Sequence, residues 1–228
     1  TRTSRYAIPY LEGLVGILVR FTATLYEPLI LLLAKSYNLT MFFTDLLMKP
    51  SSDKVTRLSA IGLENLSTES INLSRPVRVK KTRFLSLCSS NRWKPLLCPV
   101  HRGACSAQET FCLVDANAIY WLLACLDHEN VEVVEASLTA ICTLLDDRVD
   151  VDKSVGLLAE SDALKRVLNI VKQHDGEGIR QQCYWVIEKF LKKGGDRSVS
   201  DISEDRMLMS ILVSAFHYGD GTTKQMAE

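Results

Sequence analysis

The sequence predicts an all-α fold in which helical repeats stack into a right-handed superhelix, with one loop-like insertion. A similar helical segment occurs three times and begins a fourth time, and a shorter helix precedes each pair of longer ones. No window shows the sustained alternation of apolar and polar residues between hairpin turns that a sheet would require. With 47% hydrophobic residues among 228, the chain also has enough apolar material for a sizeable core.

The recurring segment has small residues in its middle and large aliphatic residues at helical spacing. Its copies begin at Val55, Val133, Ile179 and Thr223. The last three starts are about 45 residues apart, which is the length of one armadillo or HEAT unit. The first two lie almost twice as far apart. We therefore expect packed amphipathic helices, with one repeat plus an insertion between the first two copies.

Each of the three complete copies follows a second helix and a polar turn. The expected second helices are residues 39–48, 118–126 and 164–171, and the expected turns are residues 50–53, 127–130 and 174–178. Shorter helices are expected at residues 29–36, 110–115 and 153–160. Three helices per unit favour armadillo repeats over two-helix HEAT repeats. We expect armadillo-like repeats in residues 8–69 and 109–228, the last one truncated, so that the natural protein continues.

Charge and hydropathy exclude several classes of function. Lys and Arg together number 27, as do Asp and Glu, so the chain has no global field to steer it onto nucleic acid. No nucleic-acid partner is expected. The most apolar stretch is residues 8–34, and it is interrupted by Glu12, Arg20, Glu27 and Pro28. These interruptions are too frequent for a membrane span.

Cysteine usage favours a reducing compartment. The seven cysteines are odd in number, and Cys125, Cys142 and Cys183 fall inside helical patterns, where a free thiol behaves as a small hydrophobe. The chain starts at Thr1, with no visible secretory signal, and is expected to be a fragment. Cytoplasm, nucleus or both are the expected locations.

Residues 70–108 form the expected basic, loop-like insertion. Its basic residues are Arg75, Arg78, Lys80, Lys81, Arg83, Arg92, Lys94 and Arg102. One interpretation is a docking strip for phosphate, nucleic acid or an acidic partner. The other, which we favour, is a solvated loop without a binding role.

The insertion ends in a group of potential metal ligands, Cys98, His101 and Cys105, with Cys112 following. Thiolate and imidazole are the usual zinc ligands, but this spacing matches no standard finger, and Cys112 starts an expected helix. A nucleophilic Cys105 with His101 as its base is a further alternative. We expect these side chains to anchor the loop, with no metal or other cofactor.

Residues 55–67 resemble the third helix of an armadillo repeat, with Asn65 and Leu66 in the conserved positions of that family. The resemblance implies that the third helices line a groove for protein partners. The implied groove residues are Leu58, Ile61, Asn65, Ala136, Thr139, Thr143, Gln182, Trp185 and Lys189. Importin-type receptors pair an Asn with a Trp in one repeat, whereas Asn65 and Trp185 lie in different repeats. An importin-like carrier is therefore not expected, and inter-repeat packing is the favoured role for Trp185.

Whole phrases resemble the C-terminal region of plant U-box proteins with armadillo repeats. They are residues 58–66, 98–105, 133–138, 141–147 and 213–220. The resemblance runs from about residue 14 to residue 228 and includes the insertion. In that family a U-box before the repeats binds a ubiquitin-conjugating enzyme, and the repeats select the substrate or regulator. Nothing in this chain resembles the U-box.

The resemblance implies that this chain is the recognition region of an E3 ubiquitin ligase, active only in the complete protein. The alternative is a separate armadillo adaptor in signalling or trafficking, because fold alone assigns no function. An enzyme in its own right is disfavoured, since the sequence has no phosphate-binding Gly-rich loop and no Gly-x-Ser-x-Gly elbow. No catalytic residue is expected.

Overall fold

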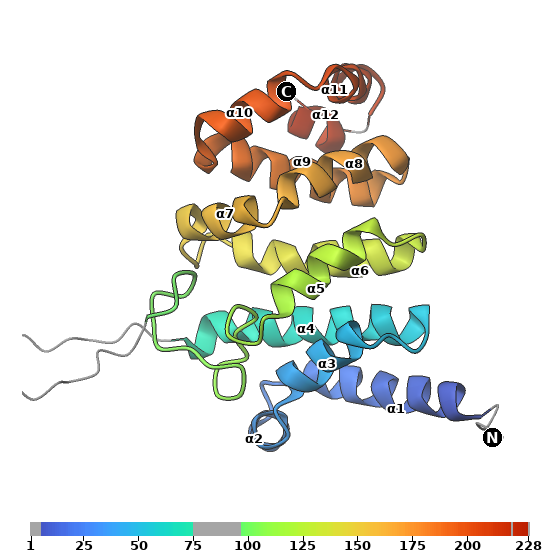
Figure 1. Ribbon diagram of the computed structural model, residues 1–228, viewed down its shortest axis with the longest axis vertical. Coiled ribbons are helices and arrows are strands. Elements are labelled where there is room, and N and C mark those ends of the chain that lie inside the picture. The colour runs from blue at the N-terminus through green and yellow to red at the C-terminus, as the bar shows by residue number, and fades with distance from the viewer. Residues whose placement is uncertain (1–5, 75–96, 220, 228) are drawn as a thin grey trace, which may run out of the picture.

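The computed structural model describes residues 6–74, 97–219 and 221–227, and over these ranges it contains helices and turns but no strand. The helices stack along one long axis, with the N-terminal helix at one end of the stack and the C-terminal helices at the other (Figure 1). The structure confirms the prediction of an all-α fold built from stacked helical repeats.

Two rows of helices run through the stack, and consecutive members of each row are in contact. The third-helix row consists of α1 (Ala7–Thr22), α4 (Asp53–Leu73), α6 (Val131–Cys142), α9 (Glu177–Lys193) and α12 (Gly221–Ala227). The second-helix row consists of α3 (Leu39–Met48), α5 (Ala118–Ala124) with the 3-10 turn η1 (Cys125–Asp127), α8 (Ala163–Gln173) and α11 (Arg206–Tyr218). The short helices are α2 (Pro28–Ser36), α7 (Val151–Glu160) and α10 (Gly195–Ser203).

Two of the three predicted polar turns supply a side-chain cap to the helix that follows, whereas α9 starts after Gly176 without one. Ser52 Oγ accepts a hydrogen bond from the Val55 N–H at 3.3 Å, at the start of α4. Asn130 Oδ1 accepts one from the Glu132 N–H at 3.0 Å, at the start of α6. Each side chain satisfies a backbone donor that the first helical turn leaves unpaired.

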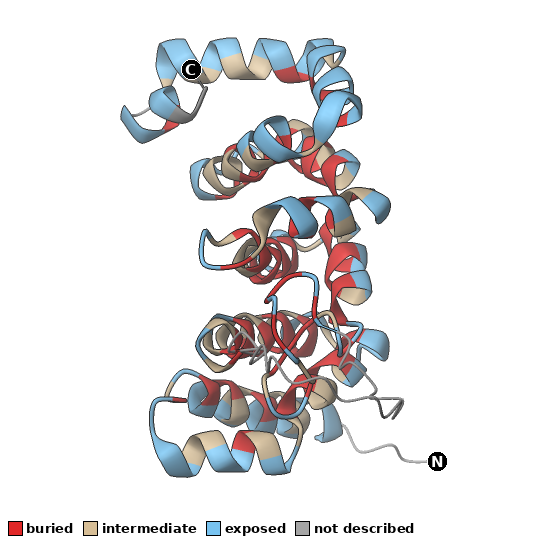
Figure 2. Ribbon diagram, turned by 90° about the vertical axis from the view of Figure 1, so that its left-hand side faces the viewer, coloured by how far each residue is buried: buried red, intermediate tan, exposed pale blue. Residues whose placement is uncertain are grey.

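Close approach between helices depends on a glycine in α4. A Cβ built at Gly62 would lie 2.6 Å from Cε2 of Phe43, which is itself fully buried. Buried residues concentrate between the two rows and become sparse in α11, where only Leu208 is buried (Figure 2). The core therefore lies between the rows and is densest in the middle repeats.

Two expectations about local structure are wrong. Residues 110–115 form turns instead of a short helix, because Phe111 and Asn117 adopt left-handed conformations with φ of 54° and 52°. The loop-like insertion was expected from residue 70, but α4 continues to Leu73. The chain thus has an irregular segment, residues 97–117, where a short helix would complete the second repeat.

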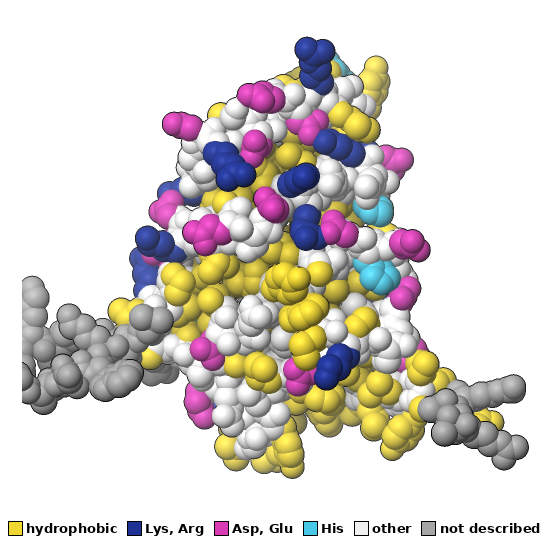
Figure 3. Space-filling model, in the orientation of Figure 1, with side chains coloured by type: hydrophobic (Ala, Val, Ile, Leu, Met, Phe, Trp, Pro, Cys, Tyr) yellow, Lys and Arg dark blue, Asp and Glu magenta, His cyan; other side chains and the backbone are white. Residues whose placement is uncertain are grey.

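Exposed apolar side chains are most numerous at the N-terminal end of the stack, and a second group lies on α11, whereas charged side chains gather over α7 to α10 (Figure 3). A cavity of about 430 Å³ between α1, α2 and α3 is lined by apolar residues including Phe21, Leu33 and Phe42. Among the described residues, no single helix is long and apolar enough to cross a membrane, and one pair, α2 with α3, passes that test only with a 53° bend.

Candidate functional site

The nine residues expected to line the groove lie on α4, α6, the 3-10 turn η2 (Thr143–Leu145) and α9. We call the surface they share the third-helix face. Ala136 is buried, and the other eight are partly buried. They do not form one uniform strip, because Leu58 and Asn65 on α4 contact α1, whereas Thr139 on α6 contacts Gln182 on α9.

The α6 and α9 residues meet beside a hollow. Gln182 Nε2 donates to Thr139 Oγ1 at 3.1 Å, which joins the two helices. Next to this contact a hollow of about 500 Å³ is lined by Cys142, Gly178, Gln181, Gln182 and Trp185. An aromatic wall with amide groups beside it can seat an apolar side chain and hydrogen-bond the backbone that carries it. This hollow is the part of the third-helix face best suited to bind a protein segment.

The α4 residues serve packing more than binding. Leu58 and Ile61 pack against the core cluster, and Leu58 Cδ1 lies next to Gly16 of α1. Asn65 Nδ2 donates to Thr22 Oγ1 at 3.0 Å, so its amide links α4 to α1. Trp185 combines both roles, because it packs against the core and also lines the hollow.

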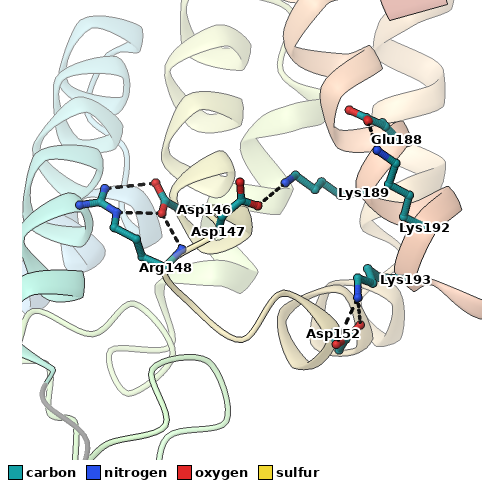
Figure 4. A network of polar contacts seen from close by, with 8 residues as sticks. All are labelled: Asp146, Asp147, Arg148, Asp152, Glu188, Lys189, Lys192 and Lys193. Atoms are coloured by element: carbon teal, nitrogen blue, oxygen red, sulfur yellow. Dashed lines mark hydrogen bonds and ion pairs between the residues drawn. The ribbon is translucent and has the colours of Figure 1, made fainter. Parts of the chain in front are cut away.

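A network of charged side chains borders the α6–α9 part of the face (Figure 4). Lys189 Nζ lies 2.7 Å from Asp147 Oδ1 and 5.0 Å from the centre of the Trp185 ring. Lys193 pairs with Asp152 at 3.1 Å, which connects α9 to α7. Arg148 pairs with Asp146 within the same turn. Of these ion pairs, Asp147–Lys189 links α9 to the turn after α6, and together the pairs give the rim of the hollow both signs of charge.

Burial perturbs two ionisable groups at the α4–α6 contact. It raises the pKa of Glu64 on α4 above its ordinary value. Burial, with the nearby Glu64 carboxylate, also raises the pKa of Cys142 to about 12. Burial therefore favours the neutral thiol of Cys142 at physiological pH, which disfavours a nucleophilic role.

The irregular segment brings together four potential ligands from residues 97–112. One ligand atom from each of Cys98, His101, Cys105 and Cys112 lies within 4.8 Å of all the others. Cys98 Sγ is 3.8 Å from Cys112 Sγ. His101 Nδ1 is 3.5 Å from Cys98 Sγ, 3.5 Å from Cys105 Sγ and 3.6 Å from Cys112 Sγ. We call these four residues the Cys–His cluster.

The electrostatics of the Cys–His cluster favour mixed protonation states. Hydrogen bonds with Cys105 and Cys112 lower the pKa of Cys98 far below its usual range, whereas contacts with Cys105 and Cys98 raise that of Cys112. The pKa of His101 rises to about 9: burial opposes the change, but contacts with Cys105 and Cys98 outweigh it. Since His101 faces three sulfur atoms, it is not the dedicated base of Cys105 that the nucleophile hypothesis requires.

Of the basic insertion, Arg102 lies within the described residues. Its Nε donates to Asp150 Oδ2 at 2.9 Å, and this contact lowers the pKa of the Asp150 carboxyl. Arg102 therefore anchors the segment to the start of α7. The remaining seven basic residues, Arg75, Arg78, Lys80, Lys81, Arg83, Arg92 and Lys94, lie outside the described residues.

Stacked units with these two helical rows define an armadillo-type repeat scaffold, and solved structures agree. A designed armadillo repeat protein in complex with the peptide (KR)4 matches with a TM-score of 0.61 at 13% identity, over 98% of this chain and 75% of its own. An engineered protein matches with a TM-score of 0.60 at 14% identity, over 99% of this chain and 74% of its own. These likenesses concern the fold. No protein-family model matches the chain.

Sequence comparison gives the relatives. The chain is 57% identical over 236 residues to an Arabidopsis thaliana protein described as "Putative U-box domain-containing protein 42", covering 100% of this chain and 23% of that protein. It is 37% and 38% identical to U-box domain-containing proteins 44 and 43 of the same plant, covering 28% of each. The resemblance to plant U-box proteins is confirmed: this chain is a repeat scaffold homologous to about a quarter of their length.

Proposed function

We propose that this chain is the substrate- or regulator-recognition region of a U-box E3 ubiquitin ligase. The observation that carries the proposal is the 57% identity over the whole chain to a protein named for its U-box. The partner would bind at the third-helix face, where the hollow beside Trp185 lies between α6 and α9. A U-box elsewhere in the complete protein would hold the conjugating enzyme.

The mechanism needs no catalytic group in this chain. A ligase of this type accelerates transfer by holding a charged conjugating enzyme close to a substrate lysine, which raises the effective concentration of the two reactants. The repeats would supply position and selectivity. Buried free thiols such as Cys125 and Cys183 support a reducing compartment, and we propose the cytoplasm or nucleus for this activity.

The first experiment compares this chain with the complete natural protein in a ubiquitination assay. Each is incubated with ubiquitin, activating enzyme, ATP and a panel of conjugating enzymes, and polyubiquitin is measured. We expect chain formation by the complete protein and none by this chain alone. Inactivity of both across the panel would overturn the ligase proposal and favour the armadillo adaptor.

A second experiment tests the recognition role of the third-helix face. In the complete protein, Gln182→Arg places a long cation in the hollow and removes the contact with Thr139. Polyubiquitin formation should be unchanged, while ubiquitin-remnant peptides from the protein's cellular targets should fall at least about tenfold, as for a lost interface hot spot. Lys165→Ala, on the exposed side of α8, is the control. An unchanged remnant profile in Gln182→Arg would place recognition elsewhere.

A further inference from the structure

We propose that Cys98, His101, Cys105 and Cys112 bind one structural zinc ion. The inference concerns the irregular segment before α5 and does not depend on the ligase proposal. It revises the expectation, drawn from the sequence, that these side chains only anchor a loop.

Four of the six distances between ligand atoms in the Cys–His cluster match a tetrahedral site, and the two from Cys105 Sγ to the other sulfurs lie within 4.8 Å. With Zn–S bonds of about 2.3 Å and a Zn–N bond of about 2.05 Å, a regular tetrahedron has edges of about 3.8 Å between sulfurs and about 3.6 Å between sulfur and nitrogen. The structure has 3.8 Å between Cys98 Sγ and Cys112 Sγ. It has 3.5 to 3.6 Å from His101 Nδ1 to all three sulfurs. The four ligand atoms therefore surround a space of the right size for the ion.

The ligand set selects the metal and its role. Three thiolates and one imidazole form a Cys₃His set, which is typical of structural zinc. Four protein ligands complete the tetrahedron and leave no open position for water or substrate. The site would therefore stabilise the fold without catalysing a reaction. Its spacing, C-x2-H-x3-C-x6-C, explains why it does not match a standard finger.

Surrounding groups orient the ligands. With Nδ1 directed at the sulfurs, the other ring nitrogen of His101, Nε2, lies 3.5 Å from Ser70 Oγ at the end of α4. Cys105 Sγ lies 3.2 Å from Ser74 Oγ. The Cys98 N–H donates to the Gly103 carbonyl at 2.8 Å, closing a turn between the first two cysteine ligands. Such outer contacts fix the tautomer and direction of metal ligands.

The position of the Cys–His cluster in the fold indicates what a zinc ion would stabilise. The segment from residue 97 to residue 117 replaces a short helix and lies between the end of α4 and the start of α7. The Asp150 N–H donates to the Val100 carbonyl at 2.8 Å, and Arg102 pairs with Asp150. Thiol hydrogen bonds are weak, so a buried histidine among three thiols gains little from them. A zinc ion would supply strong bonds at the point where helical hydrogen bonds are missing.

A disulfide is the competing arrangement of the same residues. Cys98 Sγ and Cys112 Sγ lie 3.8 Å apart, far beyond the S–S bond length of about 2.05 Å. Joining them would also remove two of the four ligands. The two arrangements are distinguished by thiol alkylation and mass measurement, because only the disulfide protects Cys98 and Cys112 from alkylation after unfolding in chelator.

The test measures metal in the chain, purified without a polyhistidine tag and under reducing conditions. We expect about one zinc per chain by elemental mass spectrometry. Chelation should lower the melting temperature, since metal-binding energy contributes directly to folding. Cobalt added to the chelated chain should give the intense visible bands and sulfur charge-transfer bands of four-coordinate cobalt thiolate. This spectrum does not depend on whether any variant folds.

Paired variants locate the site. Cys112→Ser should reduce bound zinc at least about tenfold, because three remaining ligands do not close the tetrahedron. Cys125→Ser removes another buried thiol, outside the Cys–His cluster, and should leave zinc unchanged. If Cys112→Ser fails to fold, Cys105→Ser at the less buried corner replaces it. The proposal is overturned by a wild-type chain with less than about a tenth of an equivalent of zinc and no cobalt spectrum, by full zinc in the cluster variants, or by a Cys98–Cys112 disulfide.

Discussion

The junction between α4 and α6 and the junction between α6 and α9 are built differently, although both join successive members of one row. At the first junction Ser67, Ala136 and Ala140 are buried, and Ser67 Oγ lies 2.6 Å from Thr143 Oγ1. At the second, Gln182 Nε2 donates to Thr139 Oγ1, and the long side chains of Gln182 and Trp185 line a hollow beside that contact. Small side chains permit close approach of helices, so the first junction is dense and the second leaves room for a partner.

The edges of the two junctions also differ. The irregular segment with the Cys–His cluster closes the first, whereas α7 and partly exposed ion pairs close the second. Where the regular short helix is missing, the chain uses buried polar ligands; where it is present, surface charges suffice. We therefore expect the first junction to be sensitive to small changes in its interior, and the second to tolerate changes at its rim.

The largest effect should come from a charge placed in α6, which both junctions share. Ala140 has no exposed surface, so Ala140→Asp buries an unpaired carboxylate. We expect a loss of about 3–5 kcal/mol in the free energy of unfolding. Urea unfolding followed by circular dichroism measures it, with Ala124→Asp, at an exposed position of α5, as control. Equal stability of the two variants would mean that α6 is not packed as described.

A smaller loss should follow from one added methyl group in α4. In Gly62→Ala the new Cβ would lie 2.6 Å from the Phe43 ring, which is buried and cannot move without displacing its neighbours. Overpacking of this kind costs about 1–3 kcal/mol. At Gly156 in α7 a Cβ meets nothing within 4 Å, so Gly156→Ala should gain about 0.5–1 kcal/mol of helix propensity. Opposite signs in thermal unfolding would support dense packing around α4, and matching signs would contradict it.

The helices were predictable wherever local rules and tertiary packing agree. Ser52 and Asn130 precede apolar runs and cap α4 and α6, as their hydrogen-bonding capacity predicts. The short run at residues 110–115 misled the prediction, because Phe111, Cys112 and Leu113 are fully buried without being helical. Apolar periodicity over six residues cannot distinguish a helix from a compact set of turns. The left-handed conformation of Phe111 also has no reliable signal in the sequence.

The candidate sites were predictable only in part. Sequence resemblance placed Thr139 and Gln182 on one face, but their contact depends on the register between α6 and α9, which packing sets. Cys98, His101 and Cys105 were identified as possible ligands, whereas Cys112 was assigned to a helix. Its spacing of six residues after Cys105 was the available signal. The four side chains come together only because of the path of the backbone through the turns, and no local sequence pattern specifies that path.

At the rim of the second junction, the pair of Asp147 and Lys189 should contribute little. Asp147 is 89% exposed and Lys189 is 15% exposed, so water and salt screen their attraction. A double-mutant cycle with alanine at both positions should give a coupling below about 1 kcal/mol that declines with added salt. Lys189→Ala alone should cost more than Asp147→Ala, because it also loses contact with the Trp185 ring. Equal losses, or a coupling insensitive to salt, would show that this rim is as buried as the first junction.

The smallest effect concerns Glu64, which faces the first junction from α4. Burial raises its pKa above 4.5, so folding favours the neutral acid. Its contribution to stability is therefore greatest below the pKa of the unfolded chain and declines as the pH rises through the higher pKa of the folded chain. Glu64→Gln, which stays neutral, should raise the melting temperature slightly at about pH 7, and this gain should vanish at about pH 4. Glu135→Gln, at an exposed position of α6, is the matched control. A gain that persists in acid would trace the effect to packing of the amide, and no gain at neutral pH would mean that the first junction admits enough water to solvate the carboxylate.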